Sequence, residues 1–135
     1  MTDRERLSSF TRKRFIFFLL FVILYVITEI GRYIYRPYIY TNNIFDFWIA
    51  DTVGNFTGTM TIIFCEFAVI NPDKKTGNRL LFMVTFGLIG YELVQYFITT
   101  HTCDWKDMVA TLFAGLLSWG TVSWLSKRYK DEQLE

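Results

Sequence analysis

The chain has 135 residues, of which 52% are hydrophobic and 19% are aromatic, and its formal net charge is +1. This length leaves room for one domain, and the apolar residues come in long blocks, which is typical of a membrane protein. The basic residues gather before Phe15, between Lys74 and Arg79, and between Lys127 and Lys130. They form no basic face on a folded domain, so we expect no nucleic-acid partner.

A basic segment that ends at Arg14 precedes a long apolar run that starts at Phe15. No cleavage site of small residues follows this run, so we interpret residues 15–35 as a retained membrane span rather than a signal peptide. Pro37 is expected to end this first helix. An interfacial belt of tyrosines is expected beside it, made of Tyr33, Tyr35, Tyr38 and Tyr40.

Three further apolar segments predict spans at about 47–70, 80–99 and 108–125, and breaker residues around Pro72 separate the second from the third. The predicted fold is therefore an all-α membrane protein, with residues 1–135 forming a single domain of four transmembrane helices. Because the basic residues gather at the termini and in the central turn, the positive-inside rule places both termini in the cytoplasm.

The two halves of the chain resemble each other where each returning helix begins. The matching positions have the same spacing: Asp51, Gly54, Asn55 and Gly58 in the first half, and Asp107, Ala110, Thr111 and Ala114 in the second. Offsets of three, four and seven residues share one helical face. We therefore predict two helical hairpins that form parallel repeats, with small residues that allow close helix packing.

Acidic residues inside membrane spans need a partner, water or a function. At 1.5 Å per residue, Glu29 and Glu92 lie about 20 Å from the cytoplasmic side, and Asp51 and Asp107 enter from the opposite side. These carboxyl groups are expected to meet in the outer half of the bilayer. The predicted polar cavity is lined by Glu29, Asp51, Asn55, Glu92, Gln95 and Asp107, with Arg32, Arg36, His101, Asp104 and Lys106 as secondary candidates. The alternative is a structural network that fixes helix register.

Metal and cofactor sites are not expected. His101 is the only histidine, and the two cysteines, Cys65 and Cys103, have neither the spacing of a zinc site nor a C-x-x-C motif.

The segment from Tyr91 to Gly115 resembles a motif of the VanZ-like family of small bacterial integral membrane proteins. The residues that carry this resemblance are Glu92, Gln95, Asp104, Asp107, Ala110, Ala114 and Gly115. The family's turn arginine is absent, with Thr100 or His101 near its place, and Thr111 stands where the family usually has Asn. The resemblance implies a multi-pass protein of the bacterial cytoplasmic (inner) membrane, in a family some of whose members are associated with glycopeptide antibiotic resistance. It implies no defined reaction.

The leading functional hypothesis is a non-catalytic membrane protein. Its cavity would bind a lipid-linked or amphiphilic cell-envelope molecule, with membrane lipids, a lipid-linked cell-wall precursor or a glycopeptide as partners. Paired acids and amides suit hydroxyl, amide or cationic groups, and a phosphate would need Arg32 or Arg36.

Two alternatives remain open. One is an intramembrane enzyme that acts on a lipid substrate through paired carboxylates, with no catalytic residue assigned. It is less favoured because the sequence contains neither a nucleophile triad nor a metal-binding motif. The other is a pore or membrane-perturbing effector, formed by a homo-oligomer that associates through its small residues.

Overall fold

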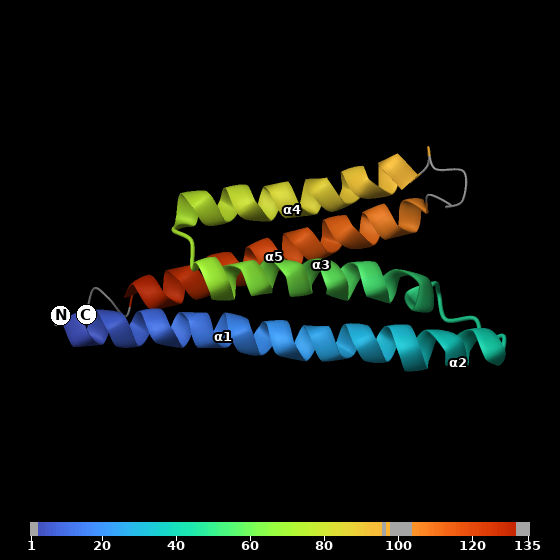
Figure 1. The fold of residues 1–135 in the computed structure, drawn as a ribbon, viewed down its shortest axis with the longest axis horizontal. Helices are drawn as coiled ribbons and strands as arrows, with labels where there is room; N and C mark the ends of the chain where they lie inside the picture. The colour runs from blue at the N-terminus through green and yellow to red at the C-terminus, as the bar shows by residue number, and fades with distance from the viewer. Residues whose placement is uncertain (1–2, 96, 98–103, 132–135) are drawn as a thin grey trace.

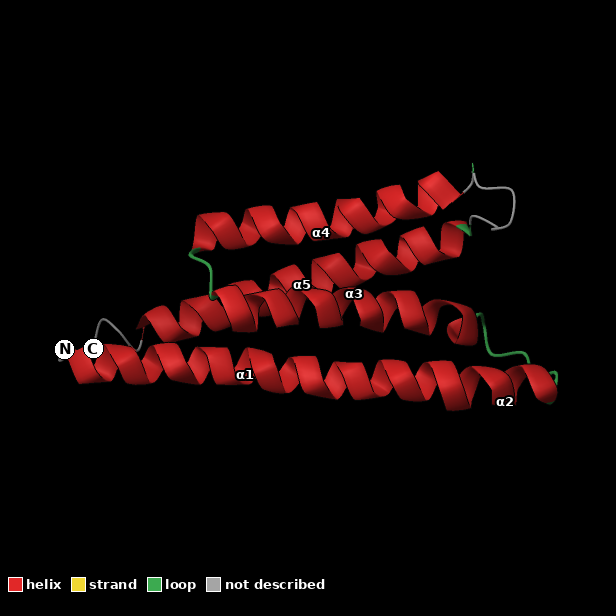
Figure 2. Cartoon of the chain, viewed as in Figure 1, coloured by secondary structure: helices red, strands yellow, loops and turns green. Residues whose placement is uncertain are grey.

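The computed structural model describes residues 3–95, 97 and 104–131, and every regular element in these ranges is helical (Figure 2). The first element is one continuous rod made of α1 (Asp3–Ile30), a π-helical turn η1 (Gly31–Tyr35) and α2 (Arg36–Thr41) (Figure 1). It is followed by α3 (Ile49–Ile70), α4 (Lys74–Gln95) and α5 (Trp105–Asp131). The predicted all-α fold is confirmed for this part of the chain.

The helices lie lengthwise beside one another and alternate in direction (Figure 1). Helix α3 packs between α1 and α5, and α4 packs mainly on α5, whereas in the described residues no Cα atom of α1 lies within 8 Å of one in α4. The start of α1, the end of α5 and the turn between α3 and α4 lie at one end, called here the terminal end (Figure 1). The opposite end, called the distal end, carries residues 42–48 and the start of α5.

Three of the described helices are long and apolar enough to cross a membrane: Arg12–Thr41, Ile49–Ile70 and Trp105–Tyr129. Their length and composition are those of membrane spans. Helix α4 has a similar length, but Arg79, Glu92 and Gln95 lower its mean hydropathy. A membrane-spanning α4, and hence the four-span topology, stays a prediction.

The expectation that Pro37 ends the first helix is wrong. The helix continues to Thr41, and the five-residue π-helical turn Gly31–Tyr35 lies directly before Arg36 and Pro37. The backbone N–H of Arg36 donates to the carbonyl of Gly31, five residues back. Proline has no backbone N–H, and its ring would clash with the carbonyl four residues back in a regular α-helix. The wider π-helical turn changes the hydrogen-bond pattern just before Pro37, so the helix can accommodate the proline ring.

The apolar core occupies the terminal half and draws on α1, α3, α4 and α5. Its buried members are Phe17, Ile63, Phe64, Phe67, Ala68, Leu81, Val122 and Leu125. The ring of Phe17 stacks on Phe64, with centroids 6.0 Å apart, and lies 5.3 Å from the centroid of Phe67. A Cβ on Gly77 would lie 3.0 Å from the Phe67 ring, so this glycine allows the start of α4 to approach α3.

Small residues determine how closely α4 and α5 approach each other. A Cβ on Gly115 would lie 2.5 Å from Oγ1 of the buried Thr85, so the two helices are in close contact at this point. In contrast, a Cβ on Gly54 or Gly58 would meet nothing within 4 Å. The predicted repeat positions thus differ in packing, because Ala110 and Ala114 are buried while the two glycines of α3 face open space.

Large apolar side chains are exposed along every helix. They include Phe18, Val22, Ile62, Phe82, Phe86, Leu116 and Trp119. An exposed apolar surface of this extent suits contact with lipid chains, because lipid is as apolar as the side chains themselves. The exposure pattern and the three long apolar helices together support a membrane protein.

Asp73 directly precedes α4, in the turn at the terminal end. Its carboxylate accepts the backbone N–H of Lys75 at 3.2 Å, and hydrogen bonding to Thr76 is the main reason why the pKa of Asp73 lies below its usual range. A lowered carboxyl pKa stabilises the folded state above the unfolded pKa, and this contribution is lost as the pH falls through the folded value.

In the Asp73→Asn variant, the free energy of unfolding is therefore expected to depend less on pH than in the wild type. The difference is expected at acidic pH, at and below the ordinary pKa of an Asp side chain. Detergent-unfolding titrations of both proteins, repeated across acidic pH, measure this difference. Equal slopes for the two proteins would contradict a stabilising role for the Asp73 carboxylate.

Candidate ligand-binding site at the distal end

Charged and amide side chains from four elements gather near the distal end and are called here the polar layer. They are Arg36 of α2, Asp51 and Asn55 of α3, Glu92 of α4, Asp104 before α5, and Asp107 of α5. Helix direction explains this grouping: α2 and α4 end here, whereas α3 and α5 begin here (Figure 1).

The continuation of the first helix past Pro37 brings α2 to the polar layer. Arg36 Nη2 lies 3.9 Å from Asp51 Oδ1, and Arg36 Nε donates to the Tyr40 hydroxyl at 3.4 Å. The Tyr40 hydroxyl in turn donates to Asp51. Because the Arg36 and Asp51 side chains are 50% and 30% exposed, the ion pair contributes little stability but holds the Asp51 carboxylate in place.

Asp107 connects α5 with its neighbours. Its carboxylate interacts with the side chain of Asn55 and with the charges of Asp104, Asp51 and Arg36. Glu92 lies close enough for its charge to interact with those of Asp107 and Asp104. One carboxylate oxygen, Asp107 Oδ1, is buried and has no hydrogen-bond partner among the described residues. The layer therefore has more acidic than basic groups.

Lys106 links the polar layer to an adjacent cavity. Asp104 receives its backbone N–H at 3.0 Å, which caps the start of α5, and Lys106 Nζ lies 3.7 Å from Asp104 Oδ2. The same ammonium lies 4.7 Å from the centroid of the Trp48 ring, within the range of a cation–π interaction.

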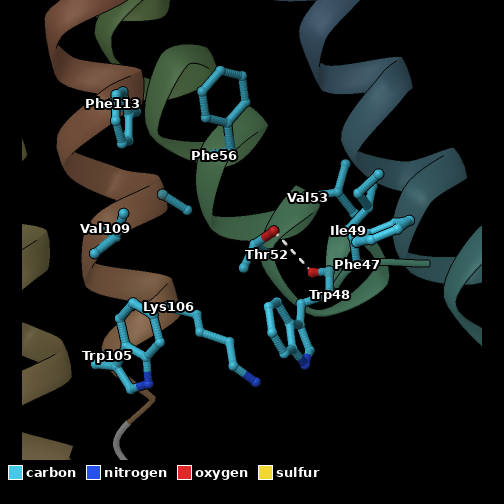
Figure 3. A pocket seen from close by; sticks show the side chains of 11 residues that line it. Phe47, Trp48, Ile49, Thr52, Val53, Phe56, Trp105, Lys106, Val109 and Phe113 are labelled. Carbon is cyan, nitrogen blue, oxygen red and sulfur yellow. Dashed lines mark hydrogen bonds between the residues drawn. The ribbon is translucent and has the colours of Figure 1, made fainter. Parts of the chain in front are cut away.

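A cavity of about 440 Å³ lies between the starts of α3 and α5 and is called here the distal groove (Figure 3). Its walls are almost entirely apolar and aromatic. The lining residues are Phe47, Trp48, Ile49, Thr52, Val53, Phe56, Trp105, Lys106, Val109, Ala110 and Phe113. Figure 3 shows Lys106 reaching toward Trp48, while Phe56 and Phe113 lie further along their helices. The groove thus offers a hydrocarbon-compatible wall with one cationic group.

The chain is strained where it enters the groove wall. Phe47 and Trp48 have φ values of 57° and 65°, which bulky residues rarely adopt. Each such residue costs on the order of 1–3 kcal/mol and persists only where its surroundings hold it. Asp46 helps to hold this turn, because its Oδ2 accepts the Ala50 N–H at 2.7 Å and the Tyr35 hydroxyl at 3.1 Å.

The structure groups most of the residues that the sequence suggested for a site. Asp51, Asn55, Glu92 and Asp107 lie in the polar layer together with Arg36 and Asp104. Glu29 lies in α1 and Arg32 in η1, where the Arg32 guanidinium lies 5.9 Å from the Tyr33 ring centroid, and their place in the site stays a prediction. Gln95 is half-buried at the end of α4, and His101 lies outside the described residues.

The distal groove was not predicted, and of the predicted site residues that the structure describes, Lys106 alone lines it. Its walls come from aromatic residues at the starts of two helices, such as Trp48 and Trp105. Aromatic residues at both helix starts are the sequence signal that points to this region, since Trp is enriched where a span meets the membrane surface. Sequence alone does not show that the two starts face each other.

Comparisons with known proteins found no match to a family model, a curated protein or a solved structure. Among the residues with described placement, no three His, Cys, Asp or Glu side chains are positioned to hold a metal ion. The site offers an apolar groove, one ammonium group, and a neighbouring layer of carboxylates with one amide and one guanidinium.

Proposed function

We propose that this protein is a multi-pass membrane protein that binds an amphiphilic cell-envelope molecule of the lipid-linked kind. Its hydrocarbon part occupies the distal groove, and its polar part lies against Lys106 and the polar layer. The supporting observation is the adjacency of a 440 Å³ aromatic groove and a charged layer, joined by Lys106. Such a site matches an amphiphile because it pairs an apolar wall with a few placed polar groups.

The proposed orientation places the terminal end in the cytoplasm and the distal end outside, in a bacterial inner membrane. The basic residues gathered at the terminal end support it through the positive-inside rule. Aromatic residues around the groove then lie at the outer interface, where Trp is favoured. The site would meet lipid-linked precursors in the outer leaflet, and the VanZ-like resemblance is consistent with an envelope role.

A phosphate at the head of the ligand would contact Lys106, because this ammonium belongs to the groove wall. Hydroxyl, amide or amino groups beyond the phosphate would meet the carboxylates and the Asn55 amide. Charge-assisted hydrogen bonds of this kind are about twice as strong as neutral ones. The site would therefore recognise a head group by its charge together with its hydrogen-bonding groups.

Filling the groove tests this proposal. Val109 lines the groove, and Leu112 is exposed on the same helix outside it. In nanodiscs, the Val109→Trp variant is expected to weaken binding of a radiolabelled polyprenyl phosphate by about tenfold or more, a loss of about 1.4 kcal/mol. Leu112→Trp serves as the matched control and is expected to bind as the wild type does.

The role of Lys106 is tested with the same assay. Lys106→Gln is expected to weaken binding of the phosphate but not of the corresponding uncharged polyprenol. Equal binding of both ligands by Val109→Trp and the wild type would exclude the groove as the site.

A second candidate function is supported by the interaction between the Glu92 and Asp107 charges. Two carboxyl groups that lie close together can serve as acid and base in an intramembrane enzyme. Turnover of a lipid substrate by the purified protein, abolished by Glu92→Gln and retained in Asp73→Asn, would favour catalysis over binding alone.

A further inference from the structure

Lys106 supplies the cationic group in the wall of the distal groove, and its ammonium has two partners. Lys106 Nζ lies 3.7 Å from Asp104 Oδ2 and 4.7 Å from the centroid of the Trp48 ring. The Lys106 and Asp104 side chains are 24% and 33% exposed, so this ion pair is partly shielded from water. The group that would bind the ligand's phosphate is therefore already paired with an acid of the protein.

The backbone holds both partners of Lys106 in place. Asp104 Oδ1 accepts the backbone N–H of Lys106 at 3.0 Å, and the Asp104 carbonyl accepts the N–H of Asp107 at 3.0 Å. The Trp48 carbonyl accepts the backbone N–H of Thr52 at 3.1 Å and its hydroxyl at 3.0 Å. Lys106, in contrast, carries its ammonium on a flexible four-carbon stem. The ammonium can thus leave Asp104 for a ligand while the carboxylate stays in place.

The ion pair between Lys106 and Asp104 is weak enough for a phosphate to replace it. Partly exposed ion pairs typically contribute about two- to fivefold to an equilibrium constant. The 3.7 Å between Nζ and Oδ2 is longer than a charge-assisted hydrogen bond, which a phosphate oxygen forms with an ammonium at about 2.7–2.9 Å. A phosphate that enters the groove therefore competes with Asp104 for Lys106.

The surrounding charges make this competition depend on the charge of the head group. The polar layer contains four carboxylates and one guanidinium. That guanidinium, on Arg36, lies 3.9 Å from Asp51 and so also has an acidic partner. Because Coulomb energy is proportional to charge, these carboxylates repel a head group with two phosphates more strongly than one with a single phosphate.

We propose that Asp104 is the specificity-determining residue of the distal groove. Its carboxylate holds Lys106 in the free site and competes with the ligand's phosphate, and this competition favours lipids with one phosphate over lipids with a diphosphate. The inference rests on the proposed function, because it concerns the head group of the ligand bound in that same groove. It narrows the ligand class to an amphiphile with a single phosphate group.

Asp104→Asn tests this role, because asparagine also caps helix starts but its side chain has no charge. In nanodiscs, this variant is expected to bind radiolabelled polyprenyl phosphate about two- to fivefold more tightly than the wild type does. The gain is expected to be larger for polyprenyl diphosphate and absent for the uncharged polyprenol. Asp104→Ser, which also keeps a capping side chain, is expected to give the same result. Unchanged or weaker phosphate binding in both variants would overturn the proposal.

A second background shows whether the gain comes from competition for Lys106. When Lys106→Gln is already present, Asp104→Asn is expected to lose most of its gain, because no ammonium remains to be released. A full gain in this background would assign the effect to simple repulsion and overturn the competition. Asp73→Asn removes an acid at the terminal end and is expected to bind all three lipids as the wild type does.

The same assay separates this inference from the proposed function. Polyprenyl phosphate binding that Val109→Trp does not weaken would exclude the groove as the site and overturn both. Binding that Val109→Trp weakens, but that the two Asp104 variants do not strengthen, would retain the groove and reject only the role of Asp104. Tighter phosphate binding in the Asp104 variants, together with weaker binding in Val109→Trp, would support both.

Discussion

Phe17→Ala is expected to lower the free energy of unfolding by about 3–5 kcal/mol, the range for removing a fully buried aromatic side chain. Phe17 has 0% exposure and contacts the rings of Phe64 and Phe67, so it joins α1 to α3 at the centre of the core. In a membrane, the loss of stability in Phe17→Ala comes from lost van der Waals packing and from the cavity that remains, and not from a loss of the hydrophobic effect in water. Unfolding in mixed micelles with increasing SDS, followed by circular dichroism, measures it.

Phe18→Ala is the matched control, because it removes the same side chain from the adjacent position. Phe18 is 52% exposed, and lipid or detergent chains would fill the space that its ring leaves. Its expected effect is within about 0.5 kcal/mol, as for other surface substitutions. Equal destabilisation by the two variants would contradict the rotation of α1 on α3 that the structure shows.

Gly115→Ala is expected to destabilise the packing of α4 on α5. The new methyl group would lie 2.5 Å from Oγ1 and 2.6 Å from Cγ2 of Thr85, so a change of side-chain rotamer does not remove the clash. Thr85 is also held by its hydrogen bond to the Leu81 carbonyl at 2.8 Å. Overpacking of this kind costs about 1–3 kcal/mol and exceeds the gain of up to about 1 kcal/mol in helix propensity.

The readout is the distance between α4 and α5, measured between spin labels at exposed Phe86 and Leu116, together with unfolding in SDS. Gly54→Ala is the control, since its methyl group would meet nothing within 4 Å. We expect this control to be neutral or stabilising by up to about 1 kcal/mol. A tolerated Gly115→Ala with an unchanged distance would show that the two helices are less closely packed than described.

Interhelical packing also explains why the site was only partly predictable. Counting residues along each helix placed Asp51, Glu92 and Asp107 at one level, because the rise per residue is fixed. It placed Glu29 at the same level, and the presence of Glu29 in the site stays a prediction, because level alone does not determine the direction of a side chain. The rotation of α1 depends on the contacts of Phe17 and on the hydrogen bond between the Thr28 and Thr57 hydroxyl groups, 2.7 Å apart.

The prediction for Pro37 failed for a local reason. A proline removes one backbone donor and normally stops a helix, but the preceding π-helical turn absorbs the mismatch. The helix therefore continues as far as Tyr40, whose hydroxyl contacts both Arg36 and Asp51. Hydrophobic pattern and breaker residues do not indicate such a turn.

The amino-acid sequence by itself determined the helical class, the approximate positions of the helices and the level at which its acidic residues gather. These properties follow from local hydrophobicity, chain breaks and a constant rise per residue. Only the tertiary structure decided which acids meet, that α1 and α4 stay apart, and that Trp48 and Trp105 enclose a groove with Lys106. Those properties depend on helix rotation and close packing, which contacts between distant residues determine.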